Sequence, residues 1–175
     1  PAPGAYEVAR HGMKNLLFPI MMLSLSLAAS GCSQAAFTAV NLPTRFHEMT
    51  VVQDVAYSPE PACTLDIYVP ASAGHQPLDV IVFFYGGRWT EGEKHNYRFV
   101  GAAFTEQNFI VVVPDYRKYP RVRFPEFVED GAKALAWVYD HIAEYHGNPE
   151  RIHVAGHSSG AHIGALLTAD AGYLA

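Results

Sequence analysis

The sequence has little that points to nucleic acid or to a metal ion. Its formal net charge is −5, from 12 Lys and Arg against 17 Asp and Glu, so it lacks the basic surface of a nucleic-acid-binding protein. The histidines are scattered, and no HExxH pattern or Cys/His spacing typical of a metal site occurs. Internal repeats and low-complexity stretches are also absent. We therefore expect no nucleic-acid partner and no metal.

Cysteine is scarce as well. Cys32 and Cys63 are the two present, and a disulfide between them would suit an oxidising compartment, but the sequence does not establish it. Half of the residues are hydrophobic and 13% are aromatic, which is typical of a globular protein. A chain of 175 residues is long enough for one domain with its own core.

The apolar run near the N-terminus is too short to span a membrane comfortably. It lies in residues 13–32, where a short basic region, an apolar region and a zone of small residues have the layout of a secretory signal peptide. We read Met13 as the start of translation and residues 1–12 as upstream read-through that takes no part in the fold. The sequence therefore predicts an exported protein.

The signal peptide ends in Ala29-Ser30-Gly31-Cys32, which resembles the lipobox of bacterial lipoproteins. In that family the cysteine becomes the first residue of the mature protein and is lipidated, although Ala29 stands where Leu is usual. The resemblance implies a lipoprotein anchored to the membrane through Cys32, in the periplasm or at the cell surface. Ordinary cleavage and secretion are the alternative. We interpret residues 33–46 as a tether.

From residue 47 onward, apolar patterns predict alternating strands and helices. The predicted strands cover 50–57 and 64–69, as an antiparallel pair, and then 80–84, 109–113 and 152–155. The predicted helices cover 97–107 with Asn108 at its end, about 125–146 with Gly147-Asn148-Pro149 as its stop, and 161–169. This alternation indicates an α/β fold with a mostly parallel sheet and helices on both faces.

The last predicted strand runs into Gly156-His157-Ser158-Ser159-Gly160. This is the G-x-S-x-G pattern in its required context of strand, sharp turn and helix. A serine hydroxyl becomes a useful nucleophile only when it is exposed beside a base and an oxyanion site. The turn exposes Ser158, and Gly156 and Gly160 let the strand and helix approach closely. The pattern predicts Ser158 as a catalytic nucleophile.

Three segments in order, Tyr85-Gly86-Gly87-Arg88-Trp89, Asp115-Tyr116-Arg117-Lys118-Tyr119-Pro120 and the serine motif, resemble the α/β-hydrolase superfamily. The resemblance covers about residues 50–169. It is nearest to the esterase/lipase branch, which includes hormone-sensitive-lipase-like carboxylesterases and kynurenine-formamidase-like enzymes. It implies that Ser158 accepts the acyl group and that Gly86, Gly87 and the Ser159 N–H form the oxyanion hole. Tyr85 replaces the usual His, with a packing or hydrogen-bonding role.

The other triad members are missing from the expected places. The superfamily order is Ser, then Asp or Glu, then His. After Ser158 the sequence has Asp170 and His162, in the reverse order, while His157 directly precedes the nucleophile. We expect none of these to be the base. We interpret residues 47–175 as the N-terminal part of an α/β-hydrolase domain that lacks its C-terminal strands, and we expect the 175-residue fragment alone to be inactive.

The expected function is hydrolysis of small-molecule carboxylic esters through an acyl-enzyme on Ser158, without a cofactor. Hydrolysis of aryl formamides is an alternative chemistry on the same residues. A non-catalytic surface lipoprotein or hydrolase remnant is an alternative of another class. The sequence leaves the oligomeric state open. For Asp115 and Arg117 we favour a buried ion pair over a place in the site, and we expect Asp130 to be a helix-start carboxylate.

Overall fold

The computed structural model of the chain describes residues 34–74 and 76–174. It divides into two compact units, Pro1–Val40 and Asn41–Ala175, and residues 34–40 of the first unit are helical. The predicted signal peptide and Cys32 lie outside the described residues. Within the described part, no helix combines the length and the apolar character needed to cross a bilayer.

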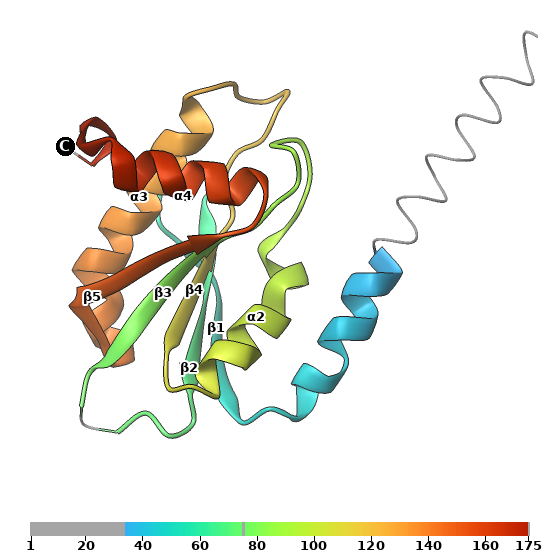
Figure 1. Cartoon of the computed structure of the whole chain (residues 1–175), viewed down its shortest axis with the longest axis vertical. Helices are drawn as coiled ribbons and strands as arrows, with labels where there is room; N and C mark the ends of the chain where they lie inside the picture. The colour runs from blue at the N-terminus through green and yellow to red at the C-terminus, as the bar shows by residue number, and fades with distance from the viewer. Residues whose placement is uncertain (1–33, 75, 175) are drawn as a thin grey trace, which may run out of the picture. The chain divides into compact units, whose positions relative to one another are not determined.

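The second unit is built on a five-stranded sheet in the order β1-β2-β4-β3-β5 (Figure 1). The strands are β1 (Met49–Ala56), β2 (Thr64–Pro70), β3 (Leu78–Phe84), β4 (Ile110–Pro114) and β5 (Gly147–Gly156). β1 and β2 pair antiparallel, which confirms the predicted pair, and β2 is also antiparallel to β4. β3 lies parallel to both β4 and β5. The described part of the sheet is therefore mixed, and every residue of β4 is buried.

Helices cover both faces of this sheet, as predicted. The α-helices of this unit are α2 (Arg98–Thr105), α3 (Glu126–His141) and α4 (Ser159–Ala169), and its short 3-10 helices are η1 (Pro43–Phe46), η2 (Lys94–Tyr97), η3 (Ile142–Tyr145) and η4 (Ala171–Tyr173). Figure 1 shows α2 and α3 on opposite sides of the strands. The strand register gives the same result, residue by residue.

Tyr68 of β2 and Ile81 of β3 both pair with Val111 of β4, so their side chains share one face. A Cβ on Gly101 of α2 would lie 2.5 Å from the Tyr68 ring, so α2 packs on that face. Phe84 is three residues beyond Ile81 and points to the opposite face. A Cβ on Gly131 of α3 would lie 3.3 Å from the Phe84 ring, so α3 covers that side.

The C-terminal ends of α2 and α3 can be compared with the ends predicted from the sequence. Asn108 follows α2 with a left-handed φ of 62°, and its N–H donates to the Thr105 carbonyl, which confirms the predicted cap. The predicted stop of α3 at Gly147-Asn148-Pro149 is wrong. α3 ends at His141, η3 follows, and His146 turns the chain with a φ of 68°. Gly147 already belongs to β5 because a non-glycine residue takes the left-handed position one residue earlier.

The end of the predicted tether docks on α2. The Asn41 side chain accepts a hydrogen bond from the Phe99 N–H and donates to the Asn96 carbonyl, while Arg98 donates to the Thr44 hydroxyl at 3.0 Å. The compact second unit thus begins at Asn41 rather than at residue 47.

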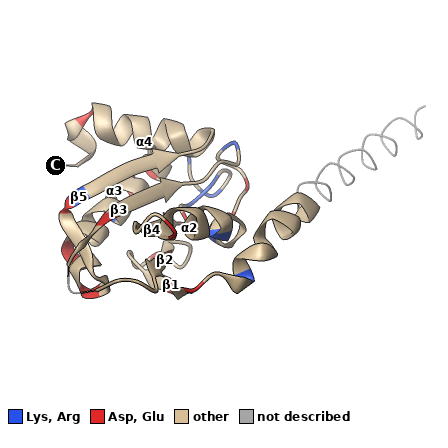
Figure 2. Cartoon of the chain, turned by 60° about the horizontal axis from the view of Figure 1, so that its bottom comes forward, with Lys and Arg blue, Asp and Glu red and all other residues tan. Residues whose placement is uncertain are grey.

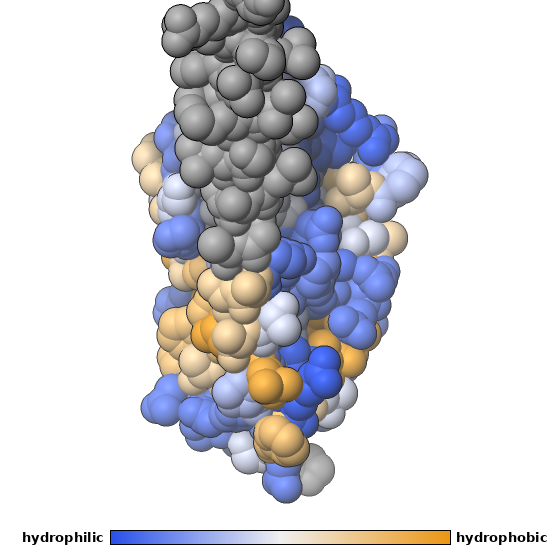
Figure 3. All heavy atoms as spheres, turned by 90° about the vertical axis from the view of Figure 1, so that its right-hand side faces the viewer, coloured by the Kyte–Doolittle hydropathy of each residue, from blue (hydrophilic) through white to orange (hydrophobic). Residues whose placement is uncertain are grey.

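The surface of the second unit includes some exposed apolar side chains, among them Phe46 at the end of η1, which is 86% exposed. On the side of the protein drawn in Figure 3, apolar residues form small groups among polar ones.

Candidate active site

The candidate nucleophile sits on a strained turn between β5 and α4. Ser158 has a φ of 53° and a ψ of −121°, a conformation that non-glycine residues rarely adopt. Such backbone strain persists only where the surrounding structure enforces it, and it is concentrated at functional sites. Ser158 is also exposed, so the turn presents its hydroxyl to solvent.

The two glycines of the motif let the turn close. A Cβ on Gly156 would lie 2.7 Å from the Ala161 nitrogen and from the carbonyl group of Gly160. A Cβ on Gly160 would overlap the carbonyl oxygens of Phe84 and Tyr85. Real Cβ contacts are not this short with backbone atoms, which cannot move aside as a flexible side chain can. The strand, the turn and the first turn of α4 therefore pack at backbone distance.

The glycine loop after β3 lies directly against the nucleophile. A Cβ on Gly86 would lie 3.0 Å from the Ser158 Cβ and 2.8 Å from the His157 ring. The Gly87 N–H donates a 2.9 Å hydrogen bond to the Oγ of Ser159, whose side chain is buried. This places the loop beside the turn. It also means that the Gly87 N–H already has an acceptor in this structure, so donating to an oxyanion requires that bond to be exchanged.

We define the oxyanion loop as residues 85–92. Within it, the N–H groups of Thr90 and Glu91 both donate to the Gly87 carbonyl. Arg88 and Trp89 have φ values of 54° and 60°. The sequence shows the two glycines of this loop but not its left-handed non-glycine residues.

The ring of Trp89 packs beside the site. It stacks on Phe127 with centroids 6.0 Å apart and meets the edge of His162 at 5.4 Å. Its indole N–H is buried and has no hydrogen-bond partner among the described residues. Trp89 thus forms a wall between α3 and α4.

The histidines and the acid near Ser158 have other contacts. His162 is exposed on α4 and packs on Trp89, and its backbone N–H donates to the Ser158 carbonyl. The Asp170 carboxylate accepts from the Gly172 N–H and so caps η4. Across residues 34–74 and 76–174, no imidazole or carboxylate is hydrogen-bonded to the Ser158 hydroxyl.

The end of the sheet at which β3, β4 and β5 finish, where Ser158 lies, is rich in charged residues. Figure 2 shows Lys and Arg in the loops beyond the strand ends, and the sequence places them after β3 and β4, at positions 88, 94, 117, 118, 121 and 123. Two buried groups of charges lie there, one around Asp130 and one around Asp115. Asp115 and Arg117 belong to different groups, so the predicted ion pair between them is wrong.

Arg117 pairs with Asp130 instead. Its guanidinium donates to both carboxylate oxygens, at 2.7 and 2.8 Å, and its backbone N–H donates to one of them at 3.1 Å. The Asp130 side chain is fully buried and paired with Arg117. The acids in the first turn of α3 are Glu126 and Glu129, so Asp130 is a member of a buried ion pair rather than the predicted helix-start carboxylate. The hydrogen bonds that Arg117 donates to Asp130 raise the pKa of Arg117. This pair joins the segment after β4 to α3.

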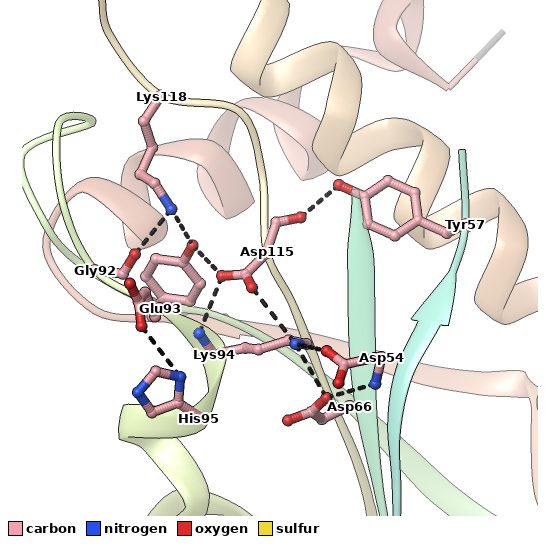
Figure 4. Close-up of polar contacts among 10 residues, drawn as sticks. Asp54, Tyr57, Asp66, Gly92, Glu93, Lys94, His95, Asp115 and Lys118 are labelled. Atoms are coloured by element: carbon pink, nitrogen blue, oxygen red, sulfur yellow. Dashed lines mark hydrogen bonds and ion pairs between the residues drawn. The ribbon is translucent and has the colours of Figure 1, made fainter. Parts of the chain in front are cut away.

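Asp115 is the centre of a second group, which we call the Asp115 cluster: Asp54, Asp66, Tyr85, Lys94, Asp115 and Lys118. Figure 4 labels all of these residues except Tyr85. Asp115 accepts from the Tyr85 hydroxyl at 2.5 Å and from the Lys94 N–H at 3.0 Å. The Tyr85 hydroxyl also accepts from Lys118 at 3.0 Å. Tyr85 therefore both packs and hydrogen-bonds, as the sequence suggested for this replacement of the usual His.

The electrostatics of the cluster follow from burial. Burial, with Asp115 nearby, raises the pKa of Tyr85, so its hydroxyl stays protonated. Burial also lowers the pKa of Lys118. For Lys94 burial acts in the same direction, but the hydrogen bond that it donates to Asp54 and the charges of Asp66 and Asp115 outweigh burial and raise the pKa of Lys94. Lys94 lies 2.6 Å from Asp54 and 3.3 Å from Asp66, which is only 1% exposed.

The partners in these contacts were not predicted from the sequence. Lys94 and Lys118 look like ordinary surface lysines, and their partners lie up to 40 residues away. Asp66 was the one visible irregularity, since it interrupts the apolar alternation of β2 between Leu65 and Ile67. A buried carboxylate in a strand requires a compensating cation, so Asp66 indicates that a Lys or Arg lies nearby without indicating which one.

Comparison with known proteins identifies the family of the chain. The BD-FAE family model matches residues 65–173. An isoprenylcysteine alpha-carbonyl methylesterase of Arabidopsis thaliana is 34% identical over 121 residues, which cover 69% of this chain and 28% of that protein. The chain spans about a quarter of the length of the curated relatives that it matches.

Two solved structures of esterases share the fold. A thermophilic esterase from Thermogutta terrifontis is 29% identical with a TM-score of 0.57, and the match covers 69% of this chain and 43% of that one. Esterase B from Lactobacillus rhamnosis has a TM-score of 0.68 at 23% identity and covers 84% of this chain and 48% of that one. The family model covers more than half of the chain, so the chain belongs to the BD-FAE family, and its relatives are α/β-hydrolase esterases.

Proposed function

We propose that the protein, at its full encoded length, is a serine carboxylesterase whose nucleophile is Ser158. The observation that carries the proposal is the left-handed turn at Ser158 with Gly86 packed against it. This arrangement presents a hydroxyl beside a loop of backbone N–H groups. The relatives support the reaction class, since those described above are a methylesterase and two esterases.

In the proposed reaction, the Ser158 Oγ attacks the ester carbonyl carbon and its proton passes to a general base. The carbonyl oxygen becomes an oxyanion stabilised by the Ser159 N–H and by the loop at Gly86 and Gly87. The C–O bond to the alcohol breaks, and the alcohol leaves with the proton from the base. Water, deprotonated by the same base, then attacks the acyl-enzyme, and the acid is released as Ser158 regains its proton.

We propose that this base is a His oriented by an Asp or Glu, both supplied by the part of the full protein that follows residue 175. The proposal rests on the order in which the superfamily resemblance places these residues after the nucleophile. Within the described residues, His162 and Asp170 already have other contacts.

A substrate panel tests the reaction class. The protein at full encoded length is assayed with p-nitrophenyl esters of increasing acyl length and with aryl formamides. We expect turnover of the short esters and little of the formamides. Turnover of the formamides alone would favour amide hydrolysis, and no turnover of either would favour a non-catalytic role.

We also propose that the protein is exported and anchored through a lipid on Cys32, on the strength of the lipobox-like sequence. Cys32→Ala should move the protein from the membrane fraction to the soluble fraction and abolish incorporation of labelled palmitate. Cys63→Ala is the matched control, because Cys63 is fully buried and should not affect fractionation. Unchanged membrane fractionation of the Cys32 variant would refute the anchor.

A further inference from the structure

The Lys118 ammonium joins the two ends of the oxyanion loop. It donates to the Tyr85 hydroxyl at 3.0 Å and to the Gly92 carbonyl at 2.8 Å (Figure 4). Lys118 lies in the segment after β4, outside the loop itself. One side chain from a neighbouring segment therefore fixes where the loop begins and where it ends.

Tyr85 is held from several directions. Its ring stacks on Tyr116 and Tyr97 with centroids 4.8 and 5.5 Å apart. The Tyr116 hydroxyl donates to the Tyr85 carbonyl at 2.8 Å. The Tyr85 hydroxyl gives its one proton to Asp115 and accepts from Lys118. Removing the lysine would take away the group that Tyr85 accepts from without disturbing its packing.

The loop between these ends needs such support. Arg88 and Trp89 both have positive φ values, and Gly92 has a φ of 97°. Residues in these conformations persist only when surrounding contacts enforce them. Gly86, at the start of the loop, packs against Ser158. The position of the oxyanion donors relative to the nucleophile thus depends on contacts made outside the loop.

We propose that Lys118 is a positioning residue that holds the oxyanion loop against Ser158 through its bonds to Tyr85 and Gly92. The inference rests on the proposed function, because it assigns a role in ester hydrolysis. Lys118 does not touch the substrate. It acts by keeping the loop's N–H groups aimed at the place where the oxyanion forms, so its loss should lower kcat more than it raises KM.

The charge of Lys118 gives this role a pH dependence. The ammonium lies 5.4 Å from the centre of the Tyr85 ring and 5.8 Å from that of the Tyr116 ring. Burial lowers its pKa, Asp115 and Glu93 oppose that change, and Lys94 adds to it. Burial also raises the pKa values of Tyr85 and Tyr116, so these phenols stay neutral while the lysine titrates.

The test measures kcat and KM for a short p-nitrophenyl ester between pH 6 and 10, with the protein at full encoded length. Lys118→Met should lower kcat by roughly tenfold to a hundredfold with KM within about threefold, a smaller loss than removal of an oxyanion donor itself. The wild type should lose rate at alkaline pH as Lys118 loses its proton, and Lys118→Arg should restore most of kcat and remove that loss. Lys133→Met is the matched control, an exposed lysine on α3.

Other results would overturn the proposal. An unchanged kcat for Lys118→Met, or a rise in KM alone, would show that the residue is dispensable or binds substrate. If the Met variant does not fold, the Arg variant decides, and an alkaline rate loss equal to that of the wild type contradicts the proposal.

Hydrogen exchange separates this inference from the proposed function. Loss of Lys118 should speed exchange of the backbone amides of residues 86–92, whether or not the protein hydrolyses esters. Absence of ester turnover in the wild type would sink the esterase proposal. Unchanged exchange in Lys118→Met would sink the positioning role.

Discussion

The Gly87 backbone N–H and the Ser159 side-chain hydroxyl form a 2.9 Å hydrogen bond that joins the oxyanion loop to the residue after the candidate nucleophile. The two residues are 72 positions apart in sequence. Both are expected to supply backbone N–H groups to the oxyanion, so this bond sets the distance between two parts of one site.

Ser159→Ala distinguishes the structural role of the Ser159 hydroxyl from the nucleophilic role proposed for Ser158. Alanine keeps the backbone N–H of residue 159 but leaves the Gly87 N–H without its acceptor, which should lower the free energy of unfolding by about 1–3 kcal/mol. Turnover should stay within about tenfold of wild type, measured as kcat on a p-nitrophenyl ester. A loss of turnover as complete as that of Ser158→Ala would contradict the assignment of the nucleophile.

Gly160→Ala should disrupt the turn. The added Cβ would overlap the carbonyl oxygens of Phe84 and Tyr85, and backbone on both sides would have to shift, at a cost of about 1–3 kcal/mol or more. The matched control is Gly164→Ala on the same helix, where the Cβ meets the side-chain methyl of Val154 at 3.0 Å. Urea unfolding should show the control within about 1 kcal/mol of wild type. Equal effects of the two variants would show that the close approach at Gly160 is unimportant.

Arg117→Met should be strongly destabilising. It removes the guanidinium and leaves the fully buried Asp130 carboxylate with the N–H of residue 117 and the more distant Lys133 ammonium at 3.8 Å, and breaking a buried ion pair costs about 3–5 kcal/mol. Arg121→Met in the same segment is the control, because Arg121 forms an exposed pair with Glu60 that should contribute about 0–1 kcal/mol. Thermal melts of both variants measure the difference. A similar melting temperature for the two would refute the structural role of the Arg117–Asp130 pair.

Lys94→Met should reduce stability in a pH-dependent way. The pKa of Lys94 is raised above its ordinary value of 10.5, so its contribution is complete below pH 10.5 and is lost as the pH rises through the folded-state pKa. The hydrogen bond that Lys94 donates and its positive charge lower the pKa of Asp54 below its ordinary value of 3.8. The stabilisation that the Asp54 carboxylate contributes is therefore present above pH 3.8 and is lost as the pH falls through the lowered pKa. Denaturant unfolding between pH 3 and 11 should show the largest gap between wild type and variant at intermediate pH. A gap that does not vary with pH would contradict the ion-pair account.

The local features of the fold were predictable from the sequence. The G-x-S-x-G turn, the antiparallel pair β1–β2 and the cap at Asn108 each depend on residues close together in the chain. Their determinants are local: glycines at close approaches, apolar alternation, and a residue that tolerates a left-handed φ. The end of α3 was mispredicted because His146 takes the position that glycine usually occupies.

The long-range polar contacts were not predictable. Asp115 and Arg117 are two residues apart and opposite in charge, which favours pairing on local grounds. The packing of α3 brings Asp130 to Arg117, and the loop after β3 brings Tyr85 and Lys94 to Asp115. Which charges meet is decided by how distant elements pack, and residue spacing carries no record of that.

The most direct test of the central claim is covalent labelling with a fluorophosphonate probe, which reacts only with an activated serine. The protein at full encoded length is incubated with the probe, digested, and the modified peptide identified by mass spectrometry. The account predicts one modification, at Ser158, that is lost in Ser158→Ala and kept in Ser159→Ala. No labelling of a folded protein, or labelling at another serine, would contradict the assignment of Ser158 as the nucleophile.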